Sequence, residues 1–137
     1  RELGITLVAY SPLGRGLLTG RFDREHRPEG EGEFRRGDSQ PRFAEGNYER
    51  NVALVDTVKK VAEGHGVTPA QVALAWVLSQ GPEVVSIPGT TRLKHLASNL
   101  AALDVSLTVE DLEALDGLGE RVAGDRYNEW GMQAVEE

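Results

Sequence analysis

Residues 84–99 read VVSIPGTTRLKHLASN, and this stretch decides the fold. Its first four residues, 84–87, are mostly β-branched and predict a strand that is buried on both faces. Pro88 and Gly89 end the strand, and leucines then recur at the spacing of an amphipathic helix. A buried strand that turns directly into a helix is typical of a parallel βα unit.

A second stretch of this kind lies near the N-terminus, where residues 5–13 read ITLVAYSPL. Its nearly continuous apolar run also predicts a strand buried on both faces, which Pro12 ends. Between the two strands the sequence predicts a long loop and two helices, and after the second strand it predicts two more helices. Because helical crossovers join parallel strands, we expect an α/β fold with a parallel sheet.

Helical periodicity defines the four helices. The first lies within residues 47–66, with Gly64 as its expected C-cap. The second opens with Thr68 as N-cap, Pro69 at the first helical position and Gln71 two residues later, which is a capping box. The fourth begins at the cap residue Thr108. Three of the helices have a clear apolar face. These faces are formed by Leu54, Val55, Val58, Val61 and Ala62 in the first helix, by Leu93, Leu96, Leu100 and Leu103 in the third, and by Leu112, Leu115 and Leu118 in the fourth.

Residues 21–43, RFDREHRPEGEGEFRRGDSQPRF, have neither a helical nor a strand period. They predict a long loop, and loops of this length are usually functional or disordered. Two interpretations stay open: a clasp over a bound ligand, or a disordered, charge-balanced surface loop. The tail after Val122 is expected to be irregular, with Trp130 and Met132 as isolated apolar anchors.

Composition excludes several classes of function. The formal net charge of −7 argues against a nucleic-acid binder, so any anion site must be local. No apolar run reaches the roughly 18 residues of a membrane span, and no signal peptide is visible. Cysteine is absent, which excludes disulfides and thiolate chemistry and suits a cytoplasmic location.

The chain of 137 residues falls in the range of one domain, and 39% of it is apolar. Two parallel strands cannot bury the apolar faces of four helices. The chain also opens on Arg1, and its only methionine is Met132. We therefore expect residues 1–137 to form one partial domain whose remaining strands lie upstream in a longer chain.

The strand ends carry the candidate site, because ligands of parallel βα proteins bind outside the C-terminal ends of the strands. Gly89 lets a backbone approach a ligand closely, and Thr90 and Thr91 place hydroxyls at the start of a helix, where an anion is favoured. Arg92 and Lys94 add positive charge. The alternative is turn chemistry with solvated charges.

Tyr10 occupies the matching position after the first strand. Its aromatic face could cover a flat ring, and Ser11, Leu13 and the backbone around Gly14 would continue that surface. The alternative for Tyr10 is a core tyrosine whose hydroxyl is satisfied by the protein.

Together, VAYSPLGRGLLTG (residues 8–20) and SIPGTTRLKHLASNLAAL (residues 86–103) resemble the aldo-keto reductases, which are NADP(H)-dependent oxidoreductases built on a (β/α)8 barrel. The resemblance extends from Gly4 to about Tyr127. It implies that this chain is the C-terminal part of such a barrel, with the last two strands and their helices. The loop at 21–43 and GDRY at residues 124–127 are similar to the subgroup that contains bacterial general aldo-keto reductases and potassium-channel β-subunits.

The resemblance also implies roles for single residues. Tyr10 would stack on the nicotinamide, and Arg21 belongs to the loop that folds over the cofactor. Gly89 and Thr91 belong to the turn at the adenosine phosphate. The pyrophosphate side would be lined by Ser11, Pro12, Leu13, Gly14 and Arg15. The adenosine end would be held by His95, Ser98 and Asn99.

Two positions depart from the family pattern, since His95 stands where Gln or Arg is frequent and Ser98 where Glu is frequent. We therefore expect Arg92 to be the partner of the 2′-phosphate, on its charge and position, while His95 is either a contact or an exposed helix residue.

The family's catalytic Asp, Tyr, Lys and His come from the first part of the barrel, and none of those motifs occurs here. The resemblance thus implies hydride transfer between NADP(H) and a small carbonyl or alcohol substrate in the intact enzyme, with no catalytic residue and no metal ligand in this chain. Two alternatives stay open: a non-catalytic relative that senses the cofactor, and an inactive truncated fragment. Neither the carbonyl substrate nor the oligomeric state is predicted.

Overall fold

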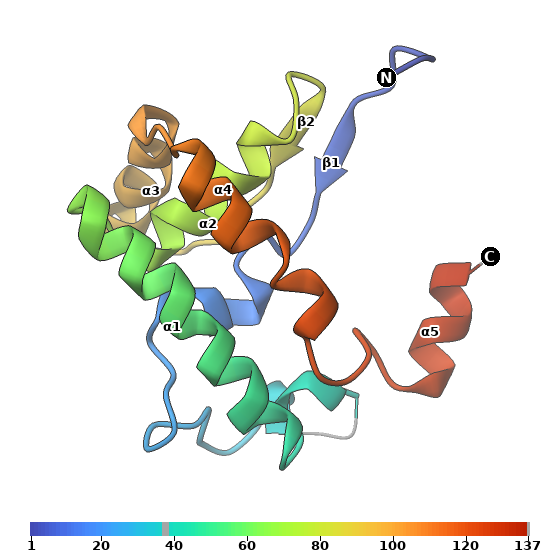
Figure 1. Ribbon diagram of the computed structural model, residues 1–137. Helices are drawn as coiled ribbons and strands as arrows, with labels where there is room; N and C mark the ends of the chain where they lie inside the picture. Colours follow the sequence, from blue (N-terminus) through green and yellow to red (C-terminus); the bar gives the residue numbers. More distant parts are fainter. Residues whose placement is uncertain (37–38, 137) are drawn as a thin grey trace.

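The computed structural model describes residues 1–36 and 39–136, and all its longer helices except the last, at residues 129–136, pack into one body from which a strand pair projects (Figure 1). The elements in chain order are β1 (Leu7–Ala9), the 3-10 turns η1 (Gly14–Thr19), η2 (Phe34–Arg36) and η3 (Pro41–Phe43), α1 (Asn47–His65), α2 (Pro69–Ser79), β2 (Val84–Ser86), α3 (Leu93–Leu100), η4 (Ala101–Asp104), α4 (Val109–Asp116), η5 (Gly119–Arg121) and α5 (Glu129–Glu136).

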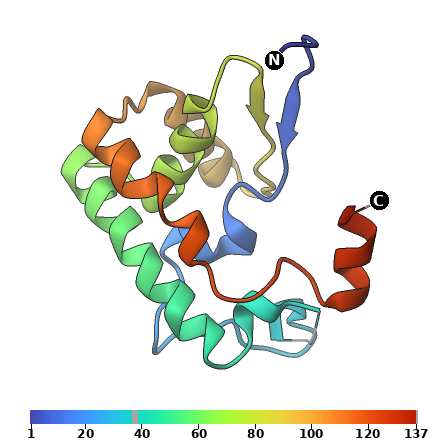
Figure 2. The ribbon, with the colours of Figure 1, turned by 45° about the vertical axis from the view of Figure 1, so that its right-hand side comes forward.

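The two strands are parallel and adjacent, as the sequence predicts. Leu7 pairs with Val84, Val8 with Val85 and Ala9 with Ser86. The helices α1 and α2 form the crossover between them, so β1 and β2 run in the same direction and end at the same edge (Figure 2).

The prediction that both strands are buried on both faces is wrong for this chain. Leu7 is 59% exposed, and Val8 and Ile87 are also more than half exposed. The cause is the small sheet: among the described residues β1 and β2 have no third strand beside them, and α2 makes the one extensive helix contact with them.

The core lies around α1, which uses its apolar face along its whole length. Val58, Val61 and Ala62 pack with Val72 of α2 and Leu115 of α4. The other half of α1 packs on the loop and on η1 in a second cluster. That cluster consists of Leu17, Phe22, Phe43, Tyr48, Val52 and Val55. The predicted apolar face of the first helix is therefore confirmed, with Leu54 at its half-buried margin.

Helix ends follow the predicted chemistry, with one exception. Thr68 Oγ1 accepts from the backbone N–H of Gln71 at 3.3 Å, and Thr108 Oγ1 accepts from that of Asp111 at 3.1 Å. The predicted cap at Gly64 is wrong, because α1 continues to His65 and ends at Gly66. Gly66 adopts the left-handed conformation at φ 65°, and its N–H donates to the carbonyls of Ala62 and Glu63, which is the favoured C-terminal geometry.

Two further expectations are corrected. The tail is not irregular throughout, because α5 forms there, and Trp130 is 81% exposed instead of anchoring the tail. In both ribbon views α5 stands apart from the helical body (Figure 1, Figure 2). Likewise, the leucine stripe forms on α3 as predicted, but Leu93, Leu96 and Leu100 are exposed. No helix in the described residues is long and apolar enough to cross a membrane.

Candidate functional site

The ends of the two strands lie side by side. Tyr10 follows β1 and Ile87 follows β2 in matching register, and the N–H of Ile87 donates to the carbonyl of Ala9 at 3.4 Å. Both strands point the same way, so the turns after Tyr10 and after Ile87 leave the sheet at one edge. This is the edge at which parallel βα proteins bind ligands.

The turn after Tyr10 is folded by left-handed backbone. Ser11 has a φ of 49° and Arg15 a φ of 57°, which are uncommon values for residues with a side chain. The neighbouring Gly14 and Gly16 adopt φ values of 55° and 92° at no such cost. The N–H of Gly14 donates to Ser11 O at 2.9 Å, so the chain doubles back beside Tyr10. Strained backbone of this kind is found mostly at functional sites.

The Tyr10 side chain is 47% exposed, and its hydroxyl is held by the C-terminal segment. Arg126 Nη1 donates to Tyr10 Oη at 2.8 Å, and Tyr127 Oη donates to the same oxygen at 3.3 Å. The hydrogen bond from Tyr127, reinforced by Arg126, lowers the pKa of Tyr10, while that of Tyr127 is raised by the same bond. The hydroxyl is therefore satisfied while part of the ring stays open to solvent.

A cavity of about 530 Å³ opens beside this turn. Of the residues expected at the cofactor, Tyr10, Ser11, Pro12, Gly14 and Arg15 line it. Its inner wall is apolar and comes from helices α1, α2 and α4 and the following turn. Those wall residues include Leu54, Val58, Trp76, Val77, Leu115 and Leu118. The cavity volume falls within the range of roughly 300–1,000 Å³ that small-molecule sites occupy.

The second group of expected residues lies outside that cavity, at the start of α3. Arg92, not a threonine, is the N-cap residue, and its side chain makes no capping hydrogen bond. Thr90 Oγ1 instead accepts from the N–H of Arg92 at 3.2 Å. The remaining residues are exposed or half-buried on α3 and the turn before it, namely Gly89, Thr91, Lys94, His95, Ser98 and Asn99.

Arg21 is exposed and does not line the cavity; its guanidinium lies 5.5 Å from the ring centroid of Phe22. The arginine that reaches the strand-end turn from this loop is Arg35, which donates to Arg15 O at 3.0 Å. The carboxylate of Glu33 holds that guanidinium, and the hydrogen bonds from Arg35 lower the pKa of Glu33 to about 2. Residues 21–43 mix several arginines with acidic residues, and this pattern does not show which arginine contacts the strand-end turn. The role of Arg35 was therefore not predicted from the sequence.

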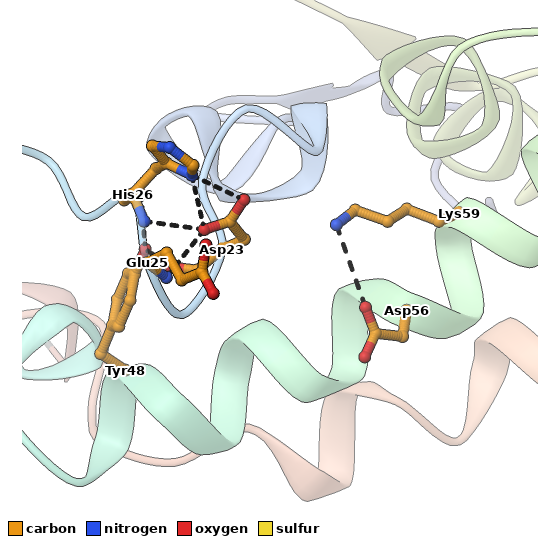
Figure 3. Close-up of polar contacts among 6 residues, drawn as sticks. All are labelled: Asp23, Glu25, His26, Tyr48, Asp56 and Lys59. Atoms are coloured by element: carbon orange, nitrogen blue, oxygen red, sulfur yellow. Dashed lines mark hydrogen bonds and ion pairs between the residues drawn. The ribbon is translucent and has the colours of Figure 1, made fainter.

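The rest of the loop is fastened to α1 through Tyr48, whose side chain is fully buried. Its hydroxyl donates to Asp23 O at 2.8 Å, and the Arg27 guanidinium lies 4.5 Å from its ring centroid. Figure 3 shows the turn above it, where the Asp23 carboxylate accepts from His26 Nδ1 at 2.9 Å and from the N–H groups of Glu25 and His26. The described part of 21–43 is therefore a packed loop with two short 3-10 turns, while residues 37–38 lie outside the described residues.

Two further arginines, Arg42 and Arg126, line the cavity beside Arg15. Buried Asn51 supports them from α1: its Nδ2 donates to Arg42 O at 2.9 Å and to Ala123 O at 2.8 Å, and its Oδ1 accepts from the N–H of Ala123. The only sequence signal for Arg126 was the GDRY segment, and there was none for Arg42 or Asn51. Within the described ranges, no three His, Cys, Asp or Glu side chains are placed to hold a metal.

These features define a class: a parallel βα protein with a cavity beside the carboxyl ends of its strands. The Aldo/keto reductase family profile matches residues 1–120. The chain is 44% identical to aldo-keto reductase str7 of Strobilurus tenacellus over 138 residues, which cover 99% of this chain and 40% of that protein. It is also 44% identical to the aldo-keto reductase yakc [NADP(+)] of Schizosaccharomyces pombe, over 93% of this chain and 37% of that protein.

Among solved structures, a glycerol dehydrogenase from Gluconobacter oxydans superposes with a TM-score of 0.73 and 32% identity, over 85% of this chain and 35% of that one. The chain belongs to the aldo/keto reductase family. It spans about two fifths of the length of the curated relatives, so its fold is part of the family's barrel, with several helices and a small parallel sheet.

Proposed function

We propose that this chain is the cofactor-binding C-terminal part of an NADP(H)-dependent aldo-keto reductase, in which the bound nicotinamide exchanges a hydride with a carbonyl or alcohol substrate. The observation that carries the proposal is the register of the strand pair, which sets Tyr10 beside Ile87 at one edge. An aromatic ring and the turn into α3 thereby reach the same edge of the sheet.

The residues present suit a dinucleotide. The Tyr10 ring is partly open, and Arg126 lies 5.3 Å from its centroid, so a nicotinamide would use the remaining ring surface. The turn from Ser11 to Arg15 would hold the pyrophosphate with backbone N–H groups and one guanidinium. Left-handed backbone at Ser11, Gly14 and Arg15 gives the turn that shape.

The adenosine end would lie at the start of α3. Arg92 and Lys94 are exposed there, and among the described residues neither forms an ion pair with a carboxylate. A helix N-terminus favours an anion, and Arg92 would take the 2′-phosphate. Gly89 and Thr91 would lie against the adenosine phosphate, with His95, Ser98 and Asn99 near the base. The relative from Schizosaccharomyces pombe is named for NADP(+), which supports this choice of cofactor.

The chain would contribute binding and orientation, and the acid–base groups would come from the part of the barrel outside it. The loop at 21–43 would act as a clasp, since Arg35 joins it to the strand-end turn. The family resemblance implies that the catalytic Asp, Tyr, Lys and His lie outside residues 1–137, so we expect no reductase activity from these residues alone.

The test compares NADPH binding by the intact protein and by this chain, using calorimetry. We expect micromolar or tighter binding by the intact protein and at least about a hundredfold weaker binding by the chain, a difference of about 2.7 kcal/mol. The reason is that, among the described residues, the outer edges of β1 and β2 have no strand partner and the apolar faces of the strands and of α3 are exposed.

In the intact protein, Tyr10→Ala should weaken NADPH binding about tenfold, through loss of stacking. Arg92→Gln should reduce the preference for NADPH over NADH, and Arg121→Gln, an exposed site on η5, should change neither. An intact protein that binds NADPH without oxidising it in the presence of any aldehyde would instead be a cofactor sensor. Tight NADPH binding by the isolated chain would contradict the assignment of this chain as an incomplete site.

A further inference from the structure

Three arginines from distant parts of the chain line the same cavity, and the charges of two of them act on the third, Arg42. Arg15 comes from η1, Arg42 from η3 and Arg126 from the segment between η5 and α5. All three line the cavity together with Tyr10. The family resemblance gives a role only to Arg15, and Arg126 lies beyond the residues that the family profile matches.

Their hydrogen bonds go to neutral acceptors. Arg15 donates to Gln40 Oε1 and to Arg126 O, Arg42 Nε donates to Gly124 O at 3.3 Å, and Arg126 donates to the Tyr10 hydroxyl. Within residues 1–36 and 39–136, none of these arginines forms an ion pair with a carboxylate. The bonds orient the guanidinium groups without neutralising them.

The carboxylates nearby do not remove this excess of positive charge. Asp116 is the one carboxylate among the described residues that line the cavity, so its charge offsets at most one of the three guanidinium groups; its Oδ1 accepts from Trp76 Nε1 at 2.7 Å. Burial, followed by the charges of Arg126 and Arg15, lowers the pKa of Arg42, and Asp125 opposes that shift only in part. Three like charges held together, one of them partly buried, favour an anion in the space between them.

The backbone behind the arginines is fixed by packing. Asn51 ties Arg42 and Ala123 to α1, as described above. Gly124 has a φ of 82°, and a Cβ there would lie 2.8 Å from Asn47 Nδ2 and 2.9 Å from Pro41 O. Only glycine fits this crossing between the tail and η3. The backbone that carries Arg42 and Arg126 is thereby fixed, and their side chains are held by Gly124 O and by the Tyr10 hydroxyl, which reduces the entropy lost when they bind a ligand.

We propose that Arg42 and Arg126 bind the carboxylate of a carbonyl substrate, so that the intact enzyme prefers aldehydes or ketones that carry an acid group. This inference rests on the proposed function, which sets the nicotinamide against Tyr10. Arg126 contacts Tyr10 directly, so an anion held by Arg126 lies beside the reacting ring and far along the cofactor from its adenosine end. The apolar side chains of the cavity wall, which include Leu54 and Leu118, would contact the apolar part of the substrate.

The test uses the intact protein and two aldehydes that differ in charge: 4-carboxybenzaldehyde and methyl 4-formylbenzoate. We expect a higher kcat/KM for the acid than for the ester. Arg42→Gln and Arg126→Gln should each lower this acid-to-ester ratio about 10- to 100-fold, the range for one lost hydrogen bond between charged groups. Arg42→Lys and Arg126→Lys should keep part of the ratio, and the control Arg121→Gln should leave it unchanged.

The dissociation constant of NADPH, measured by fluorescence in every variant, separates the outcomes. An unchanged ratio in the glutamine variants, or a wild type that does not prefer the acid, would overturn the proposal. A loss of NADPH affinity with equal losses for both aldehydes would show that the arginines bind the cofactor's pyrophosphate, which also overturns it. An intact protein that neither binds NADPH nor reduces either aldehyde would refute the proposed function itself.

Discussion

The helical body and the strand edge of this chain differ in how far each completes its own packing. In the body, Val55 of α1 and Val72 and Leu74 of α2 are each at most 2% exposed, α1 ends at its C-cap Gly66, and α2 begins at its N-cap Thr68. At the edge, Leu7 and the leucines of α3 are exposed. The difference teaches that the body is self-contained, while the edge is built to be covered by the rest of a barrel.

A pair of leucine truncations tests this difference and should give the largest effects. Leu74 on α2 is 2% exposed and Leu93 on α3 is 85% exposed. In the 137-residue chain, Leu74→Ala should lower the free energy of unfolding by about 2–5 kcal/mol, because it leaves a cavity. Leu93→Ala should change it by less than about 0.5 kcal/mol. Urea unfolding followed by circular dichroism measures both.

The same two substitutions in the intact protein sharpen the comparison. Leu93→Ala should then cost more than in the isolated chain, because neighbouring strands would cover α3. An equal and small cost in both settings would show that the leucine face of α3 stays exposed, and that the edge is not covered in the way the barrel requires.

Two glycines provide a matched pair with a smaller effect. Gly124→Ala in the tail should destabilise the chain by about 1–3 kcal/mol, since its φ is positive and its Cβ would strike Pro41 and Asn47. Gly64→Ala inside α1 should stabilise it by about 0.5–1 kcal/mol, because a Cβ there meets no atom within 4 Å. Thermal melts of both variants suffice, and a neutral Gly124→Ala would mean that the tail does not cross η3 as described.

Much of the body could be predicted from the sequence because local rules govern it. The apolar spacing of α1 and the boxes at Thr68 and Thr108 are determined within one or two turns. The C-cap of α1 was predicted at the wrong residue because Gly64 and Gly66 are both glycines near the end of the apolar pattern. The structure shows that Gly66 is the cap, since its N–H donates to the carbonyls of Ala62 and Glu63 at the helix end.

The missed features depend on contacts distant in sequence or on weak local signals. Arg42 and Arg126 are 84 positions apart by number, and only the bonds of Asn51 and the close crossing at Gly124 bring them together. Helix α5 begins with a cap, because Asn128 Oδ1 accepts from the N–H of Gly131 at 3.0 Å. The helix was missed because the apolar pattern after this cap is too short to show a helical period. The exposure of the strand pair depends on the elements packed around it. The strand propensity of the residues carries no information about those elements.

The smallest expected effect is the pH dependence of the turn that joins the loop to the body (Figure 3). The hydrogen bond and charge of Asp23 raise the pKa of His26, and the hydrogen bond from His26 lowers that of Asp23. Because the pKa of His26 is raised, protonated His26 stabilises the folded turn. This stabilisation is fully present below the ordinary histidine pKa and is lost as the pH rises through the raised value. Because the pKa of Asp23 is lowered, its ionised carboxylate also stabilises the turn. This stabilisation is fully present above the ordinary aspartate pKa and is lost as the pH falls through the lowered value.

The two conditions overlap between about pH 4 and pH 6.5, the ordinary values of the two groups, so the turn should be most protected there. Limited proteolysis should therefore cut within residues 22–28 more slowly at pH 5.5 than at pH 8.5, with a small ratio because both side chains are largely exposed. His26→Gln should remove the pH dependence, while cutting in the tail, which has no histidine, serves as the internal control. A cutting ratio that is the same in the wild type and in His26→Gln would show that Tyr48 and the backbone bonds of Asp23 hold the turn without the ion pair.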